Sequence, residues 1–202
     1  MISAMNMTPF LIIRIFTWVI CGLFIFSRVS LAEELIMVNK ALEQIFSKAS
    51  SCDKETISLS DEQIRRIEEM AGMTFQEAHS KVIVVYLAKE KESITGYAFE
   101  DTVIGKWGLI HYLLVLNPGG IVVDTVILDY REIRGRPIAK RRFLRQYLGK
   151  TAQDPLRLRK DIDGVTGATI SSRSLTEGIR KLLYTFQLIK SDLDKFGKEN
   201  VL

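Results

Sequence analysis

Four apolar runs decide the fold: KVIVVYLAKE (residues 81–90), SITGYAFEDTV (93–103), GLIHYLLVLN (108–117) and GIVVDTVILDYRE (120–132). All four are rich in β-branched and aromatic residues, which favour β-strands. Turn residues separate them at 89–92, 105–108 and 117–120. Spacers this short favour antiparallel neighbours, because a parallel crossover needs a dozen residues or more. The stretch therefore predicts an antiparallel β-meander within an α+β fold.

Segments with helical periodicity flank this predicted sheet. Residues 34–48 carry apolar side chains at helical spacing, and a second helix is predicted from Ser60 to Met70, with Ser60 as its N-cap. A third is predicted from Ser172 to Ile189, because its apolar residues share one face. The predicted organisation is a helical arm over 33–79, a main domain over 80–190 and a polar tail over 191–202.

The N-terminal segment resembles an export signal. Arg14 precedes an apolar stretch, Ile15–Phe26, which at twelve residues falls short of the roughly 20 that a bilayer-spanning helix needs. Ser30 and Ala32 supply small residues three and one before a cut. Residues 1–32 are therefore predicted to be a signal peptide, with an uncleaved anchor as the alternative. Either one predicts a periplasmic or other extracytoplasmic location.

Composition argues against several classes of function. Without residues 1–32 the chain has 26 basic and 24 acidic residues, too even a balance for nucleic-acid binding. The two cysteines and two histidines lie at no metal-ligand spacing, and no acid/base or nucleophile–base pattern is present. No catalytic residue and no metal site are predicted. The run over 136–150 is predicted to be a helix whose apolar face carries Ile138, Phe143, Leu144 and Tyr147. Its basic residues could form a solvated helix face or a positive surface beside an anionic cofactor or substrate.

The segment with the clearest chemistry is DGVTGATISS, residues 163–172, which leads into the third predicted helix. Glycines allow close approach of the backbone, and a small Ala168 keeps the surface beside Thr169 open. The unpaired N–H groups and the positive dipole end of the helix favour a phosphate there. An ordinary capping loop is the alternative. A nucleotide-binding P-loop is excluded because its spacing and its lysine are missing.

The run from Asp163 to Thr169 also matches the motif Asp-x-x-(Ser/Thr)-Gly-Ala-Thr. On this motif the chain resembles the FMN-binding domain family, which includes the G subunit of the Rnf electron-transport complex and the C subunit of the sodium-pumping NADH:quinone reductase. The resemblance implies FMN bonded to Thr169 through a phosphoester, with Asp163, Thr166, Gly167 and Ala168 in the cofactor-binding loop. It also implies a separate flavin transferase that uses FAD and Mg.

A flavin carried in this way implies electron transfer. The predicted function is that of an extracytoplasmic electron carrier, or a redox subunit of a membrane-associated electron-transport chain, with a membrane-associated redox partner protein. A flavin-dependent reductase subunit for a small acceptor and a non-redox binding module are the alternatives. Arg131, Glu132, Tyr112 and Tyr130 could border the flavin ring, although tyrosines in a sheet more often pack in the core.

Overall fold

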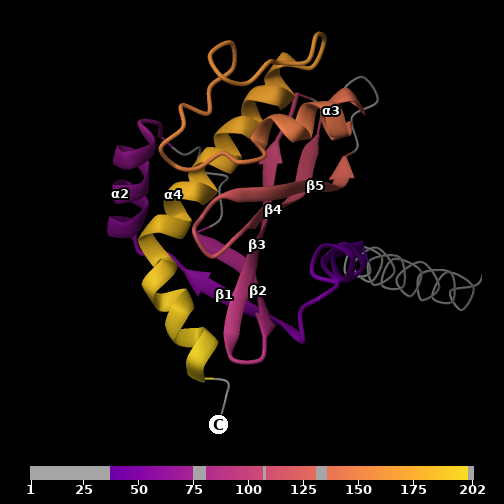
Figure 1. Ribbon diagram of the computed structural model, residues 1–202. Helices are drawn as coiled ribbons and strands as arrows, with labels where there is room; N and C mark the ends of the chain where they lie inside the picture. The colour runs from indigo at the N-terminus through magenta and orange to yellow at the C-terminus, as the bar shows by residue number, and fades with distance from the viewer. Residues whose placement is uncertain (1–36, 75–80, 107, 131–135, 200–202) are drawn as a thin grey trace, which may run out of the picture. The chain divides into compact units, whose positions relative to one another are not determined.

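The computed structural model describes residues 37–74, 81–106, 108–130 and 136–199. The chain divides into two compact units, residues 1–40 and 41–202, and the fold below is that of the second. Its centre is a five-stranded antiparallel sheet in which each strand lies beside the next one in sequence (Figure 1). The strands are β1 (Ser51–Ser58), β2 (Val82–Glu90), β3 (Ser93–Ile104), β4 (Leu109–Leu116) and β5 (Val122–Tyr130). The predicted meander and the α+β class are confirmed.

Strand β1 is the element that the sequence did not predict. It pairs with β2 from Ser51 opposite Lys89 to Ser58 opposite Val82. It lies inside the predicted helical arm, so that arm contains an edge strand of the sheet. Its sequence, SCDKETIS, is mostly polar and gives no apolar strand signal. Charged side chains are a common feature of edge strands because they discourage pairing with another chain.

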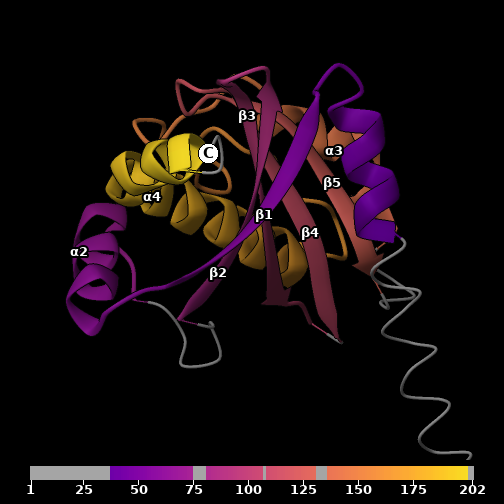
Figure 2. The same ribbon diagram turned by 90° about the horizontal axis from the view of Figure 1, so that it is seen from below.

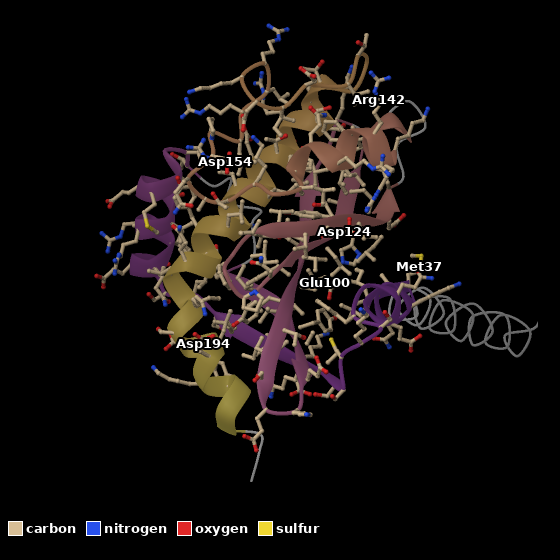
Figure 3. The ribbon with its side chains drawn as sticks, viewed as in Figure 1. Met37, Glu100, Asp124, Arg142, Asp154 and Asp194 are labelled. Carbon is tan, nitrogen blue, oxygen red and sulfur yellow. The ribbon has the colours of Figure 1, made fainter. Side chains whose placement is uncertain are left out.

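Helix α4 (Thr169–Glu199) crosses one face of the sheet (Figure 2). Its predicted apolar residues are all buried: Leu175, Ile179, Leu182, Leu183, Phe186 and Ile189. The helix continues through most of the segment predicted as a polar tail. Leu193 is fully buried, and Asp194, on the C-terminal part of α4 (Figure 3), accepts a 2.7 Å hydrogen bond from the Tyr97 hydroxyl. These contacts anchor the end of the helix to β3.

Helix α2 (Asp61–Ala71) packs beside α4. Its ends follow the sequence prediction: Ser60 and Gln63 form a capping box, and Gly72 closes the helix in the left-handed conformation, with φ of 60°. Residues 37–45 are also helical. In the described part of the chain, no helix is both long and apolar enough to cross a membrane. The predicted signal peptide over 1–32 lies outside the described residues.

The basic run after β5 is a series of short turns where a continuous helix was predicted. It consists of η1 (Arg136–Ala139), α3 (Arg141–Leu144) and η2 (Arg145–Tyr147). The series is interrupted because Lys140 has an extended backbone. The predicted apolar face is nonetheless correct, since these side chains are buried: Ile138, Phe143, Leu144 and Tyr147. The Tyr147 hydroxyl lies 2.8 Å from that of Thr176 and fixes the segment to α4.

Candidate functional site

The motif loop, residues 163–168, ends in a tight turn immediately before α4. The Ala168 N–H donates to the Val165 carbonyl at 2.9 Å, and Gly167 lies within this turn at φ of 81°. A positive φ at the third residue of a turn is the feature that requires glycine. Ala168 is buried and its carbonyl accepts the first helical hydrogen bond, from Ser172. The turn thus fixes the direction in which α4 presents its first residue.

Two fully buried serines hold this turn in place. The Ser172 hydroxyl accepts from the Val165 N–H at 3.1 Å, which ties the loop back to the first turn of the helix. The Ser171 hydroxyl accepts from the Lys106 N–H at 3.3 Å, next to the turn between β3 and β4. The serines that follow the motif are therefore positioning residues for it, joined both to the loop and to the sheet.

Gln146 fixes the start of the motif loop. Its side-chain amide donates to the Asp163 carbonyl at 3.2 Å and accepts from the Asp163 N–H at 2.7 Å. Both bonds are made by the main chain of Asp163. The side chains of Asp163 and Thr166, which the resemblance assigns to the cofactor-binding loop, do not take part in them. Both side chains are exposed, and within the described residues neither has a hydrogen-bond partner. They remain available to a ligand or another protein.

Asp161 organises the chain just before the motif. Its carboxylate accepts from the N–H groups of Leu156, at 3.1 Å, and Arg157, at 2.9 Å, and pairs with Lys150 at 3.0 Å. Burial alone raises the pKa of this carboxyl, but the hydrogen bonds and the ammonium group outweigh it and leave the pKa below its ordinary value. The role of Asp161 cannot be predicted from the sequence, because it depends on contacts that only the folded loop creates.

Thr169 is the first residue of α4, and its side chain is exposed. Its hydroxyl has no partner among the residues that the structure describes. The N–H groups of Thr169 and Ile170 likewise donate to no protein group there. Free N–H groups and the positive end of a 31-residue helix suit a negatively charged group attached at this position. The geometry therefore fits the phosphate that the sequence predicted.

A pocket of about 490 Å³ opens beside the motif loop. We call it the motif pocket. One side is the motif segment 163–166, and the other carries Lys140, Arg142, Phe143 and Gln146 from the basic run. Arg142 extends from α3 (Figure 3), and both cationic residues are exposed. Part of the basic run thus faces a cavity that it shares with the motif. Its volume falls within the range of small-molecule and cofactor sites.

Tyr112, one of the suggested flavin neighbours, lies elsewhere. It is fully buried, and its hydroxyl donates to Asp101 at 3.0 Å beside Gly178 of α4. Asp101 also pairs with the buried Lys181 at 2.6 Å. Tyr112 is therefore part of a buried polar cluster under the helix. Tyr130 is half-buried at the end of β5, and the suggested residues 131 and 132 lie outside the described residues.

Comparisons with known proteins agree with the motif. Residues 105–184 match the sequence model of the FMN-binding domain. The chain is 24% identical over 157 residues to the G subunit of the Na(+)-translocating ferredoxin:NAD(+) oxidoreductase complex of Acetobacterium woodii, covering 73% of this chain and 72% of that relative. It is 31% identical over 104 residues to the G subunit of the proton-translocating ferredoxin:NAD(+) oxidoreductase complex of Clostridium ljungdahlii, covering 48% of this chain and 56% of that relative. The resemblance predicted from the motif is confirmed.

Proposed function

We propose that this chain, whose residues 105–184 match the FMN-binding domain, is an extracytoplasmic electron-transfer subunit that carries FMN on Thr169. The observation that carries the proposal is the exposed, unpartnered Thr169 hydroxyl, presented at the N-terminus of α4 by a turn that requires Gly167. A covalent link at this position retains the cofactor outside the cell, where a dissociated flavin would be lost.

The link forms by transfer of an FMN group from FAD. The Thr169 oxygen forms a bond to the phosphorus of the FMN half, the phosphoanhydride bond breaks, and AMP leaves with the electron pair. The hydroxyl proton passes to a base. Within the described residues the Thr169 hydroxyl contacts no base, so we assign the base and the Mg ion to a separate flavin transferase. The exposed loop of small residues suits entry into another enzyme's active site.

The motif pocket is the place we assign to the flavin ring. It lies against the motif segment, and its other side is lined by the Lys140 and Arg142 side chains. Cations near a flavin stabilise its reduced, anionic form and raise the midpoint potential. The bound flavin supplies transfer of one or two electrons. The protein's contribution is to hold the ring, limit its contact with water and set the charge around it.

A place in a membrane-associated electron-transport chain is supported by two observations. The relatives described above are subunits of ferredoxin:NAD(+) oxidoreductase complexes that translocate ions. The second is the export signal predicted over residues 1–32. We infer that a membrane-associated redox protein exchanges electrons with the flavin. N-terminal sequencing of the exported chain tests the location: a start at Glu33 supports it, and an intact N-terminus on a cytoplasmic protein contradicts it.

A redox titration tests the flavin's place in the motif pocket. The flavinylated protein and its Arg142→Gln variant are titrated by spectroelectrochemistry, with Arg145→Gln as the matched control. Arg145 is an exposed cation of the same basic run, but it does not line the pocket. Loss of Arg142 is expected to lower the midpoint potential by on the order of 20 mV, and loss of Arg145 to leave it unchanged. Equal potentials in all three proteins would exclude the ring from this pocket.

A further inference from the structure

A second pocket, which shares no residue with the motif pocket, lies between α2, α4 and the loop that precedes the motif. Its volume is about 290 Å³. We call it the arginine pocket, because three of its lining side chains are Arg157, Arg173 and Arg180. Among the described residues that line it, Glu177 is the one carboxylate, so two positive charges are in excess there. None of the predicted motif residues lines it.

The three arginines have no anionic partner in the described part of the chain. Neither a salt bridge nor a side-chain hydrogen bond pairs any of them, and Glu177 makes no ion pair there either. Arg157 and Arg173 are exposed, but Arg180 is half-buried. The Arg180 Nε atom is fully buried and lacks any hydrogen-bond partner. A buried guanidinium N–H without an acceptor is unfavourable, and a bound anion would satisfy it.

Two of these guanidinium groups converge on one point. The Nη2 atoms of Arg180 and Arg157 lie 3.7 Å and 4.0 Å from where a Cβ atom on Gly72 would be. The negative dipole end of α2 is nearby, and it is an alternative reason for their position. That end carries only about half an elementary charge. Two of its four C-terminal carbonyls, at residues 68 and 69, already accept from the N–H groups of Met73 and Gly72. Two full positive charges exceed what the helix end can offset.

The loop beneath the arginines is held in an unusual conformation. Leu156 lines the pocket, is buried and has φ of 44°, a left-handed value that is strained for a side chain with a Cβ. The Asp161 carboxylate holds this conformation through the N–H groups of Leu156 and Arg157. Strained backbone of this kind is concentrated at binding and catalytic sites. Leu156 and the arginine that follows it, Arg157, both line the pocket.

We propose that the arginine pocket binds a compact oxyanion of the phosphate class. Guanidinium groups match the geometry of phosphate oxygens, and two excess positive charges match a dianion. The volume lies at the lower edge of ligand pockets, which favours a small anion or a terminal phosphoryl group. The pocket extends along α4 away from the proposed attachment point: Arg173 lies one helical turn from Thr169, and Arg180 lies about 16 Å along the axis from Thr169 at 1.5 Å per residue.

Calorimetric titration with inorganic phosphate at constant ionic strength tests the proposal. The full-length chain carrying Thr169→Ala is used, so that no FMN phosphate is present and the result does not depend on flavin attachment. We expect saturable binding that weakens at least tenfold in both Arg157→Gln and Arg180→Gln. The matched control is Arg145→Gln, an exposed arginine that lines neither pocket, which should bind as the parent does. Circular dichroism verifies that each variant is folded.

Glu177→Gln supplies a gain-of-binding test. It removes the negative charge that the described lining of the pocket carries, so phosphate should bind several-fold more tightly, a change that a purely structural role for the arginines would not produce. A parallel titration with AMP distinguishes a free anion from the phosphoryl group of a larger molecule. If AMP binds with the same affinity as phosphate, the pocket accepts the phosphoryl group of a larger molecule. If AMP does not bind, the ligand is a free anion. No saturable phosphate binding in the millimolar range, or the same affinity in Arg180→Gln as in the parent, would overturn the proposal.

Discussion

The Gly167→Ala variant distinguishes a role of the motif turn in flavin attachment from a role in the stability of the fold alone. Gly167 has φ of 81°, and a Cβ added to it would meet no atom within 4 Å. The whole effect of the substitution is therefore backbone strain, which is about 1–2 kcal/mol for an L-residue in this region. Gly149 is a matched control, because it has φ of 77° and equally open surroundings but lies outside the motif.

Both variants should lose about 1–2 kcal/mol of unfolding free energy, measured by denaturant titration. Only Gly167→Ala should also slow flavin attachment, because the turn must be intact when Thr169 enters the transferase. A strain of this size corresponds to a rate about 5- to 30-fold lower. The assay follows the intact mass of each protein with time in the presence of FAD, Mg and transferase. Normal labelling of Gly167→Ala, or equal slowing of Gly149→Ala, would refute this reasoning.

Three further substitutions test how the site is built. Asp161→Asn should lower the unfolding free energy by about 2 kcal/mol at neutral pH. Because the pKa of Asp161 is depressed in the folded state, the difference in unfolding free energy between the wild type and the variant should vanish as pH falls through the acid range. A difference that stays constant down to low pH would contradict this prediction. Gln146→Ala should lower the unfolding free energy, measured by denaturant titration, by only about 1 kcal/mol, since water can replace the bonds of Gln146 to the exposed Asp163. An unchanged denaturation midpoint would show that those bonds do not contribute to stability. Gly178→Ala should lower the unfolding free energy, measured by thermal denaturation, by about 1–3 kcal/mol despite the higher helix propensity of alanine. The reason is that the new Cβ atom would lie 2.6 Å from the Tyr112 hydroxyl. A variant more stable than the wild type would disprove this packing.

The sheet and its covering helix could be predicted because their signals are local. Alternating and β-branched runs gave the strands from β2 to β5, and helical spacing gave the buried face of α4. Strand β1 escaped prediction because it is polar and is defined by pairing with residues that lie 24 to 38 positions further along the chain. The extended Lys140 that divides the basic run likewise has no signature in the local pattern.

The candidate site likewise has features that the sequence predicts and features that only the tertiary fold determines. The glycine-containing turn and the exposed threonine at a helix start follow from short-range chemistry. The amide of Gln146 reaches the motif across 17 residues of sequence, and the pairing of Ser171 with the turn between β3 and β4 spans 65. Contacts at such separations depend on the tertiary fold. The convergence of Arg157 and Arg180 near Gly72 is of the same kind.

Intact-mass analysis of the chain co-expressed with a flavin transferase tests whether FMN is bonded to Thr169. Thr169→Ala removes the proposed attachment oxygen, and Thr102→Ala removes an exposed threonine hydroxyl on β3, outside the motif, as a matched control. We predict that the wild type and Thr102→Ala gain the mass of FMN less one water, and that Thr169→Ala gains nothing. A wild-type chain left unmodified while a control substrate is labelled, or a Thr169→Ala chain that still acquires FMN, would contradict the account.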